Sequence, residues 1–494
     1  MKLILWFKVS KRFSSMQKLK KFEELPGPRS YPIIGNLPEL KIFGGDLEFN
    51  PFDKFCIKLH QKYGDLVRWS ILGNNNVFVF KPEHAKIVFQ NEGPSPNRPS
   101  VIPWEVYSKR KNYPPGLVNS QGEIWKNQRS ASNPIVAKPQ AVAMYLDTHN
   151  TIIDEFINIM MKNSSNGDPF IVQKFEIELK YVLLEMMSIV AFDQRLQCIN
   201  AQRRSPEILK LFNSIKDYGD LTSQLYYNIP IWKYFRNSLW KEFENTSDYV
   251  YDFTRKYVSE SYNYVKNLND KAKHTMLQQY LLNKNNLSFN DIVSIMSEFL
   301  LAAFDTTATT LHFWLHRIST HPDIQEEIYE EIMKLDKKDY IDQDDLSKIP
   351  LLKASLKESQ RLHSIAPTNG RVLPNDIILD NYLIPKNTTV NVAFFLMSKS
   401  EKYFKNSEKY DPKRWLKEIN SDPINPYTSM PFGFGSRMCI GRRLAEQKMY
   451  LIMIKILKNF RLEYVGKEPK LGFRLIVVPD YDLALKFIPR INQI

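Results

Sequence analysis

A glycine-rich loop surrounds one of the three cysteines of the chain and precedes a predicted helix. Its sequence is Pro431-Phe432-Gly433-Phe434-Gly435-Ser436-Arg437-Met438-Cys439-Ile440-Gly441. Glycines allow the backbone to turn tightly, so that amide N–H groups can point at the sulfur atom. The helix expected from Arg442 to Phe460 would place its positive N-terminal end beside Cys439 and lower the pKa of the thiol. Such a loop favours a thiolate that binds a metal ion such as iron, whereas a glycine-rich turn around a buried cysteine is the simpler alternative.

An acid followed by two alcohols lies inside a long predicted helix. The helix is expected over 289–320, with Ser288 as its N-cap, and it contains Asp305, Thr306 and Thr307. Aspartate and threonine are poor helix formers, so something other than helix propensity is expected to keep them there. An acid beside an alcohol can relay protons to a bound reactant. A polar contact inside the core is the alternative.

Charged residues at two further places have the spacing of partners. Glu358 and Arg361 are three positions apart on one face of a predicted helix and can pair. Arg414 lies further along the chain, within Asp411-Pro412-Lys413-Arg414-Trp415. Taken alone, Glu358 and Arg361 could form an ordinary surface salt bridge worth less than ~1 kcal/mol.

A tryptophan and an arginine one turn apart could bind a carboxylate. Trp125 and Arg129 lie on one face of a predicted helix, where an indole N–H and a guanidinium can reach the same anion. Arg371 is a second candidate for the same anion. The spacing of Trp125 and Arg129 is weak by itself, because it is common by chance.

These segments occur in the order found in the cytochrome P-450 family, and the chain resembles that family from about Pro26 to its C-terminus. The loop matches Phe-x-x-Gly-x-Arg-x-Cys-x-Gly at every fixed position. The resemblance implies haem b (iron protoporphyrin IX) as the cofactor, with Cys439 as the axial iron ligand and Phe432 beside it. It also implies that Trp125, Arg129, Arg371 and Arg437 bind the haem propionates.

The resemblance further implies a monooxygenase that inserts one oxygen atom of O2 into a lipophilic substrate such as a sterol, steroid or ecdysteroid-like molecule. Thr306 would hydrogen-bond dioxygen, and Asp305 would relay protons. Glu358, Arg361 and Arg414 would form a structural triad that holds the cysteine loop. Two residues depart from the family pattern: Ala303 stands where glycine is usual, and Ser364 where proline is expected. A haem-thiolate isomerase or dehydratase and a non-catalytic haem sensor stay as alternatives, which the Asp305–Thr306 pair disfavours.

The stretch from Arg361 to Arg371 resembles the mitochondrial branch of the family. This similarity implies electrons from a [2Fe–2S] ferredoxin, which an NADPH-dependent flavoprotein reductase reduces in turn. The expected docking residues are Lys353, Lys357, Arg442 and Arg443, whose positive charge would attract an acidic partner. The alternative is a microsomal-type enzyme that takes electrons directly from a flavoprotein reductase and acts on xenobiotics or fatty acids.

The first 22 residues hold seven lysines and arginines and no acid. Apolar residues at helical spacing between them indicate a mitochondrial transit peptide over 1–24 and a location on the matrix side of the inner membrane. The apolar start is shorter than the ~20 residues that span a bilayer. A helix lying on a membrane surface, with the endoplasmic reticulum as the compartment, is the alternative. Peripheral membrane association is expected. The net charge is +14, but the sequence has no stripe of basic and aromatic residues that would indicate nucleic-acid binding.

The remaining sequence predicts a mainly helical α+β fold with small sheets contributed by both chain ends. A proline-rich hinge is expected over 25–45, followed by one domain over 46–494. The expected helices are 148–162, 171–190, 245–282 and 289–320, and the expected strands are 66–71, 76–80, 377–384, 388–392 and 473–488. The segment from Arg98 to Leu117 is expected to cover an apolar pocket lined by Ala302 and Phe304. His312, His316, Cys56 and Cys198 are expected to be ordinary core or surface residues.

Overall fold

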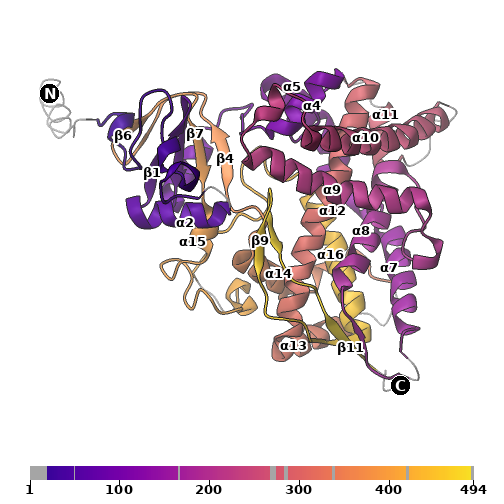
Figure 1. Ribbon diagram of the computed structural model, residues 1–494. Coiled ribbons are helices and arrows are strands. Elements are labelled where there is room, and N and C mark those ends of the chain that lie inside the picture. The colour runs from indigo at the N-terminus through magenta and orange to yellow at the C-terminus, as the bar shows by residue number, and fades with distance from the viewer. Residues whose placement is uncertain are drawn as a thin grey trace, which may run out of the picture.

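The computed structural model describes residues 19–48, 51–164, 167–266, 274–282, 287–335, 340–418 and 422–490. Most helices pack together in one part of the molecule, and the larger sheet forms a second part beside them (Figure 1). The predicted mainly helical α+β fold is confirmed. The helices are α2 (Phe52–Tyr63), α3 (Pro82–Gln90), α4 (Ile102–Lys111), α5 (Gly122–Ser132), α6 (Pro139–Ala143), α7 (Leu146–Met161), α8 (Phe175–Phe192), α9 (Pro206–Tyr227), α10 (Ser238–Val265), α11 (Met276–Leu282), α12 (Phe289–Ser319), α13 (Pro322–Met333), α14 (Pro350–Leu362), α15 (Phe394–Ser398) and α16 (Arg442–Asn459).

The long helix α12 runs through the centre of the helical part. It begins where the sequence predicted, because the Ser288 hydroxyl accepts the Asp291 N–H at 3.1 Å and the Asp291 carboxylate accepts the Ser288 N–H at 2.8 Å. Among the described residues α12 is the one helix long and apolar enough to cross a membrane, but 61% of that stretch is buried inside the protein. Burial of this kind is typical of a core helix.

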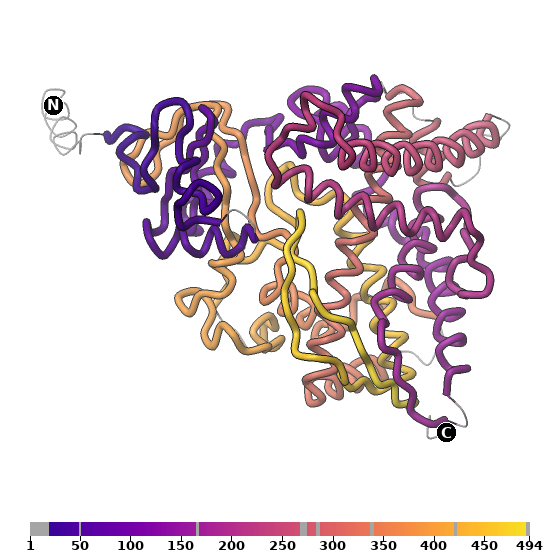
Figure 2. Tube along the Cα trace, in the orientation of Figure 1, coloured from indigo at the N-terminus to yellow at the C-terminus, as the bar shows by residue number. Residues whose placement is uncertain are grey.

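The larger sheet joins two distant parts of the sequence. Within the described residues its strand order is β1 (Leu66–Ile71), β2 (Asn74–Val79), β7 (Thr389–Val392) and β4 (Asn369–Val372). Strands β2 and β7 pair in parallel, and the indigo and orange segments of Figure 2 lie side by side there. The expectation that both chain ends share a sheet is thereby confirmed.

The smaller sheets differ in detail from the predicted strands. The predicted strand 377–384 is a hairpin of β5 (Ile377–Leu379) and β6 (Tyr382–Ile384), because Asp380 and Asn381 take positive φ angles at the turn. The predicted strand 473–488 is divided among β9 (Leu471–Phe473), β10 (Val477–Pro479) and β11 (Leu485–Pro489), and β11 pairs with β3 (Phe170–Val172) and β8 (Phe460–Tyr464).

Two predicted helices also begin or end differently. The first turn expected at 171 is strand β3, and α8 begins at Phe175. The single helix expected over 245–282 is two helices, α10 and α11, with residues 267–273 outside the described part.

The segment expected to be a hinge packs against the larger sheet. The Pro26 carbonyl accepts the Arg68 N–H at 2.8 Å, and the buried side chain of Asn36 binds Ser70 N at 2.6 Å. No α-helix forms over 25–45, as the prolines predicted, although two short 3-10 helices, Leu37–Glu39 and Lys41–Phe43, lie there. Residue 20 pairs with β6 and Phe22 is buried, so the folded part includes residues within the predicted transit peptide 1–24. Residues 1–18 of that peptide lie outside the described part.

Candidate active site

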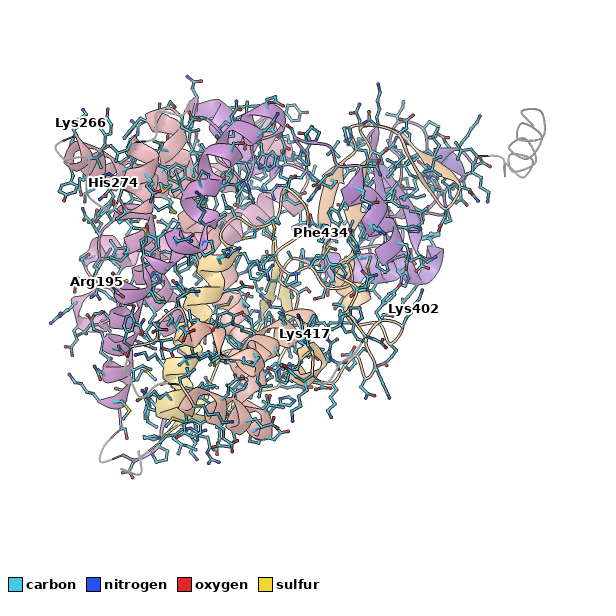
Figure 3. The ribbon with its side chains drawn as sticks, turned by 180° about the vertical axis from the view of Figure 1, so that it is seen from behind. Arg195, Lys266, His274, Lys402, Lys417 and Phe434 are labelled. Carbon is cyan, nitrogen blue, oxygen red and sulfur yellow. The ribbon has the colours of Figure 1, made fainter. Side chains whose placement is uncertain are left out.

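The cysteine loop lies where the helical and β-rich parts meet, and Figure 3 shows Phe434 of this loop near the middle of the molecule. Gly433 and Gly435 have φ angles of 74° and 73°, which side chains rarely allow. The Cys439 N–H donates to the Phe432 carbonyl at 2.8 Å, and helix α16 begins three residues after Cys439, as predicted, at Arg442. These bonds fix the sulfur at the entrance to the helix.

The thiol of Cys439 is exposed, yet it is surrounded by protein. Removal from bulk water raises its pKa, and this effect outweighs the Gly441 N–H and the charges of Arg129 and Arg98, which lower it. The predicted lowering of the thiol pKa is therefore wrong for the protein without a bound metal. A metal cation would reverse the balance, since a coordinated thiol loses its proton. An accessible sulfur so enclosed lies on the wall of an internal space.

Arginine side chains gather around this space. Arg437 donates to the Pro96 carbonyl at 2.8 Å and to the Ser120 carbonyl at 2.6 Å, and it stacks on the Trp125 ring at 4.3 Å. Burial, together with Arg98, Arg371 and Arg129, lowers the pKa of Arg437 to about 9. Cations this close require a compensating negative charge.

Two buried atoms of this cluster, Arg437 Nη1 and Arg129 Nε, have no hydrogen-bond partner within the described part of the chain. Unpaired buried donors of this kind are rare in folded proteins. A bound group with carboxylates would satisfy them and balance the charge, so the residues present fit the propionates of a haem. Arg98 was not identified from the sequence, where its only local sign was its place at the start of the predicted covering segment.

Arg371 lies in the same cluster but serves the loop. Its Nε donates to Glu92 at 2.5 Å, its Nη1 to Asn369 Oδ1 at 2.6 Å, and its Nη2 to the Phe434 carbonyl at 2.7 Å. The structure thus places most of the guanidinium on protein acceptors. Glu92 was missed by the sequence analysis, because nothing in the local sequence links it to residues more than 270 positions away.

The acid and alcohol of α12 lie side by side and are half-buried. The Thr306 hydroxyl donates to the Ala302 carbonyl at 2.6 Å, one turn earlier in the helix. The Asp305 carboxylate accepts from Lys180 of α8 at 3.0 Å. Lys180 was not identified from the sequence, because a contact between two helices leaves no mark on the spacing within either.

Phe304 does not line the internal space. It is fully buried and packs edge-on against Phe212 of α9, with ring centroids 5.5 Å apart. Residues two apart on a helix point to nearly opposite sides, so Phe304 and the half-buried Ala302 cannot share one face. The expectation for Phe304 was wrong.

Glu358, Arg361 and Arg414 are brought into contact. The fully buried carboxylate of Glu358 accepts from Arg361 Nη2 at 2.7 Å and from Arg414 Nε at 2.9 Å. It also accepts from Trp415 Nε1 at 2.8 Å and from Asp411 N at 3.1 Å. The predicted surface alternative is thereby excluded, and Trp415 is an additional partner.

The predicted covering segment folds over α12 and contains α4. Trp104 Nε1 donates to Thr222 of α9 at 3.1 Å, and the Tyr107 hydroxyl donates to Asp248 of α10 at 2.8 Å. A pocket lies between this segment and helices α9, α10 and α12. Its lining includes Trp104, Tyr113, Tyr218, Ser297, Glu298 and Leu301.

Glu298 fastens the end of the covering segment to α12. Its carboxylate accepts the Val118 N–H at 2.5 Å, and a side chain on Gly116 would lie 2.3 Å from the carboxyl carbon. Burial raises the pKa of Glu298 to about 7, against the opposing effects of Val118 N–H and Arg98.

The ionisation of Glu298 should make stability depend on pH. Because its pKa is higher in the folded than in the unfolded chain, the group favours folding at low pH, and this contribution is lost as the pH rises through about 7. Glu298→Gln cannot ionise. We expect the unfolding free energy of the native protein to fall, relative to this variant, by up to about 3 kcal/mol between pH 5 and pH 8. Urea unfolding across this range measures the difference. Glu330→Gln, at an exposed site, is the control, and a pH-independent difference for Glu298→Gln would contradict the expectation.

The four predicted docking residues lie on α14 and at the start of α16. Arg442 pairs with Glu446 at 3.0 Å, and its guanidinium lies 5.4 Å from the Phe432 ring. Lys357 lies over the Trp415 ring. Lys353 is half-buried, and burial lowers its pKa while the charge of Glu446 raises it. Arg443 is exposed. Lys353 and Arg442 thus share Glu446 as a neighbour.

The remaining candidates are core residues, as expected. His312 and His316 are buried against Tyr481 and Tyr464, and burial lowers the pKa of His312 to about 3 and of His316 to about 4. Cys56 and Cys198 are fully buried.

Comparison with known proteins identifies the class to which this fold and site belong. The sequence profile of the family described as Cytochrome P450 matches residues 25–487. The chain therefore belongs to the cytochrome P450 family, and it is a haem-thiolate enzyme of the monooxygenase type that binds haem b.

Similarity to curated proteins extends over nearly the whole chain. Cytochrome P450 10 of Lymnaea stagnalis is 28% identical over 481 residues, covering 96% of this chain and 87% of the relative. The mitochondrial cholesterol side-chain cleavage enzyme of Hypanus americanus is 30% identical over 487 residues, covering 97% and 92%. The enzyme of the same description from Sus scrofa is 30% identical over 443 residues, covering 87% and 83%. These similarities are consistent with the mitochondrial branch of the family.

Proposed function

We propose that the protein is a mitochondrial, ferredoxin-dependent monooxygenase that inserts one oxygen atom of O2 into a sterol-like or similar lipophilic substrate. The observation that carries this proposal is that the Cys439 thiol, enclosed by protein, lies close to an arginine cluster with unpaired donors. The intact acid–alcohol pair of α12 favours oxygen activation over the isomerase, dehydratase or sensor alternatives. The names of the similar mitochondrial enzymes favour a sterol-like substrate.

In this proposal the protein side chains have separate tasks. Cys439 would supply the thiolate that binds the haem iron, and the haem, when bound, would supply the activation of dioxygen. Arg129 and Arg437 hold the propionates through their unpaired donors, while the Trp125 ring supports Arg437. The covering segment and α12 exclude water from the substrate.

Thr306 and Asp305 manage protons at the reacting site. The Thr306 hydroxyl can rotate from the Ala302 carbonyl towards the internal space, since its oxygen both donates and accepts. The Asp305 carboxylate is oriented by the Lys180 ammonium, one residue away from Thr306. A proton can therefore pass from the α8 side of the helix to the threonine.

Thr306→Ala should divert electrons from product to hydrogen peroxide. Loss of the hydroxyl removes a group that directs protons, and general acid–base groups contribute 10²–10⁴-fold. We expect the product formed per NADPH to fall by about an order of magnitude or more. NADPH, product and peroxide are measured together in the reconstituted system. Thr310→Ala is the matched control, because Thr310 makes the same type of helix bond one turn further on. Unchanged coupling in Thr306→Ala would remove this residue from the mechanism and revive the non-oxygenase alternatives.

We propose that ferredoxin docks on Lys353, Lys357, Arg442 and Arg443. Exposed charges act mainly on the rate of encounter, and salt limits their reach to about 8 Å. Reversal of Lys353 and Lys357 to Glu should raise the apparent KM for ferredoxin several-fold at low salt, with a smaller effect on turnover at saturation.

The control is a pair of exposed lysines with the same spacing, Lys54 and Lys58 on α2. Lys357 neighbours Glu358, so the carbon monoxide spectrum must first show that the variant holds haem. Native ferredoxin dependence in a folded double variant would exclude this surface.

We infer a mitochondrial location from the acid-free N-terminus and from the similarity to mitochondrial enzymes. A fluorescent reporter carrying residues 1–30 should enter mitochondria. A reticular pattern would instead favour the endoplasmic reticulum and a flavoprotein reductase as the donor.

Peripheral membrane association is supported by the connection between α9 and α10. Ile229, Ile231, Tyr234 and Phe235 are 55–81% exposed there. Lys233 lies between them in the chain, and Arg236 follows Phe235. Apolar and basic side chains together suit an anionic bilayer surface. Co-sedimentation with anionic vesicles, which Tyr234→Ser with Phe235→Ser should weaken, tests this interaction.

A further inference from the structure

Glu92 lies two residues after the end of helix α3, and its side chain contacts the cysteine loop. It is 7% exposed. One carboxylate oxygen, Oε1, accepts from Ser436 N at 3.0 Å and from Ser436 Oγ at 3.1 Å, and the other, Oε2, accepts from Arg371 Nε at 2.5 Å. A buried carboxylate with three donors is held in a single orientation.

Arg371, which binds Glu92, also binds the other side of the turn. Its Nη2 donates to the Phe434 carbonyl at 2.7 Å, and its guanidinium stacks on the Phe89 ring at 5.0 Å. Glu92 and Arg371 therefore bind the carbonyl of residue 434 and the amide of residue 436, on either side of Gly435.

Gly435 is matched to this carboxylate. Its φ angle of 73° favours glycine, and a Cβ atom there would lie 2.4 Å from Glu92 Oε1. The turn can approach Glu92 only because this residue has no side chain. Since Met438 N also donates to the Gly435 carbonyl at 3.1 Å, the position of the turn determines the position of the residue next to Cys439.

The segment that follows Glu92 holds the next part of the loop. The Pro96 carbonyl accepts from Arg437 Nε at 2.8 Å, and the Asn97 carbonyl accepts from Val372 N at 2.9 Å. Residues 434, 436 and 437 are thus all fixed by the segment 92–97 or by its partner Arg371.

We propose that Glu92, acting with Arg371, is the positioning residue that sets the geometry and the electron affinity of the Cys439 site. This inference rests on the proposed role of Cys439 as the haem ligand. Glu92 acts in two ways. It fixes the turn that precedes Cys439. Its negative charge also offsets the positive charges of Arg371, which it binds, and of Arg437, which is close enough to interact with it electrostatically. Removal of this charge favours the reduced, more negative state of the site, because the arginines are then less compensated.

The test compares haem-loaded Glu92→Gln with Glu83→Gln. The control, Glu83→Gln, is at an exposed position of helix α3, which precedes Glu92. For Glu92→Gln we expect a positive shift of the reduction potential, a several-fold loss of the thiolate-type fraction in the carbon monoxide spectrum, and faster hydrogen exchange in residues 430–441. Glu83→Gln should match the native protein in all three measurements. A merely structural role would speed exchange without shifting the potential.

Ser436→Ala keeps the backbone bond to Glu92 and loses only the hydroxyl, so it covers the case in which Glu92→Gln does not fold. Because this variant keeps the Glu92 charge but removes one donor that compensates it, we expect a smaller shift of the potential in the opposite, negative direction, together with a smaller increase in the exchange rate. A native potential in folded Glu92→Gln, or in Ser436→Ala if Glu92→Gln cannot be obtained, overturns the proposal. That result would leave the ligand assignment standing, because the thiolate-type spectrum of the native protein and its loss in a Cys439 variant report on the ligand separately.

Discussion

Replacement of Cys439 by Ala is expected to abolish the thiolate-type carbon monoxide spectrum while the fold survives. The loop does not depend on the sulfur for its shape, because residues 434, 436 and 437 are held by Glu92, Arg371 and Pro96. The bond from residue 439 N–H to the Phe432 carbonyl is a backbone bond and also persists. Loss of the thiolate-type spectrum would therefore result from the loss of the sulfur atom and not from a change in the shape of the loop.

Cys56→Ala is the matched control, since it removes a sulfur from a fully buried apolar position. We expect it to cost about 1 kcal/mol of stability and to leave the spectrum unchanged. Circular dichroism of both variants establishes that the helices are retained. If Cys439→Ala kept the thiolate-type spectrum, another residue would have to be the ligand.

Replacement of Glu358 by Ala should have the largest effect on stability. Its buried carboxylate receives bonds from Arg361, Arg414, Trp415 and the Asp411 amide. Removing one partner of a buried ion pair leaves an uncompensated charge and costs about 3–5 kcal/mol. Whole proteins are stable by only about 5–15 kcal/mol, so we expect little folded, haem-containing protein at 37 °C.

The measurement is the denaturant midpoint together with the haem content of purified Glu358→Ala. Glu326→Gln is the comparison, because Glu326 makes a two-bond pair with Arg490 at the surface and should cost less than about 1 kcal/mol. Native-like stability of Glu358→Ala would show that the triad does not hold the cysteine loop.

Local spacing was sufficient to predict those parts of the site that lie within one element. Cys439 follows a glycine turn and precedes a helix, Asp305 and Thr306 are neighbours, and Glu358 and Arg361 are one turn apart. The sequence could therefore place each of these groups on its element. Phe304 was expected to line the pocket with Ala302 because the two residues are close in sequence. Residues two positions apart on a helix point to nearly opposite sides, so this expectation was wrong.

Residues whose importance comes from contacts between elements left no such pattern. Glu92 and Arg371 are 279 positions apart, and Lys180 and Asp305 are 125 positions apart. Strand β4 contains glycine, asparagine and arginine, which are not typical strand residues. It forms because its backbone pairs with β7, so the tertiary context and not the local propensity decides its structure.

The parallel pairing of β2 with β7 has a consequence for how the chain reaches its native state. Val77 pairs with Val390, 313 positions later in the chain. During synthesis at ~5–20 residues per second, β2 is therefore an unpaired edge strand for tens of seconds. Exposed edges attract other chains, and non-local pairing is slow to form. The β1–β2 hairpin should thus depend on chaperones until the second half of the chain is available, and the yield of the recombinant protein should rise when synthesis is slowed or chaperones are supplied.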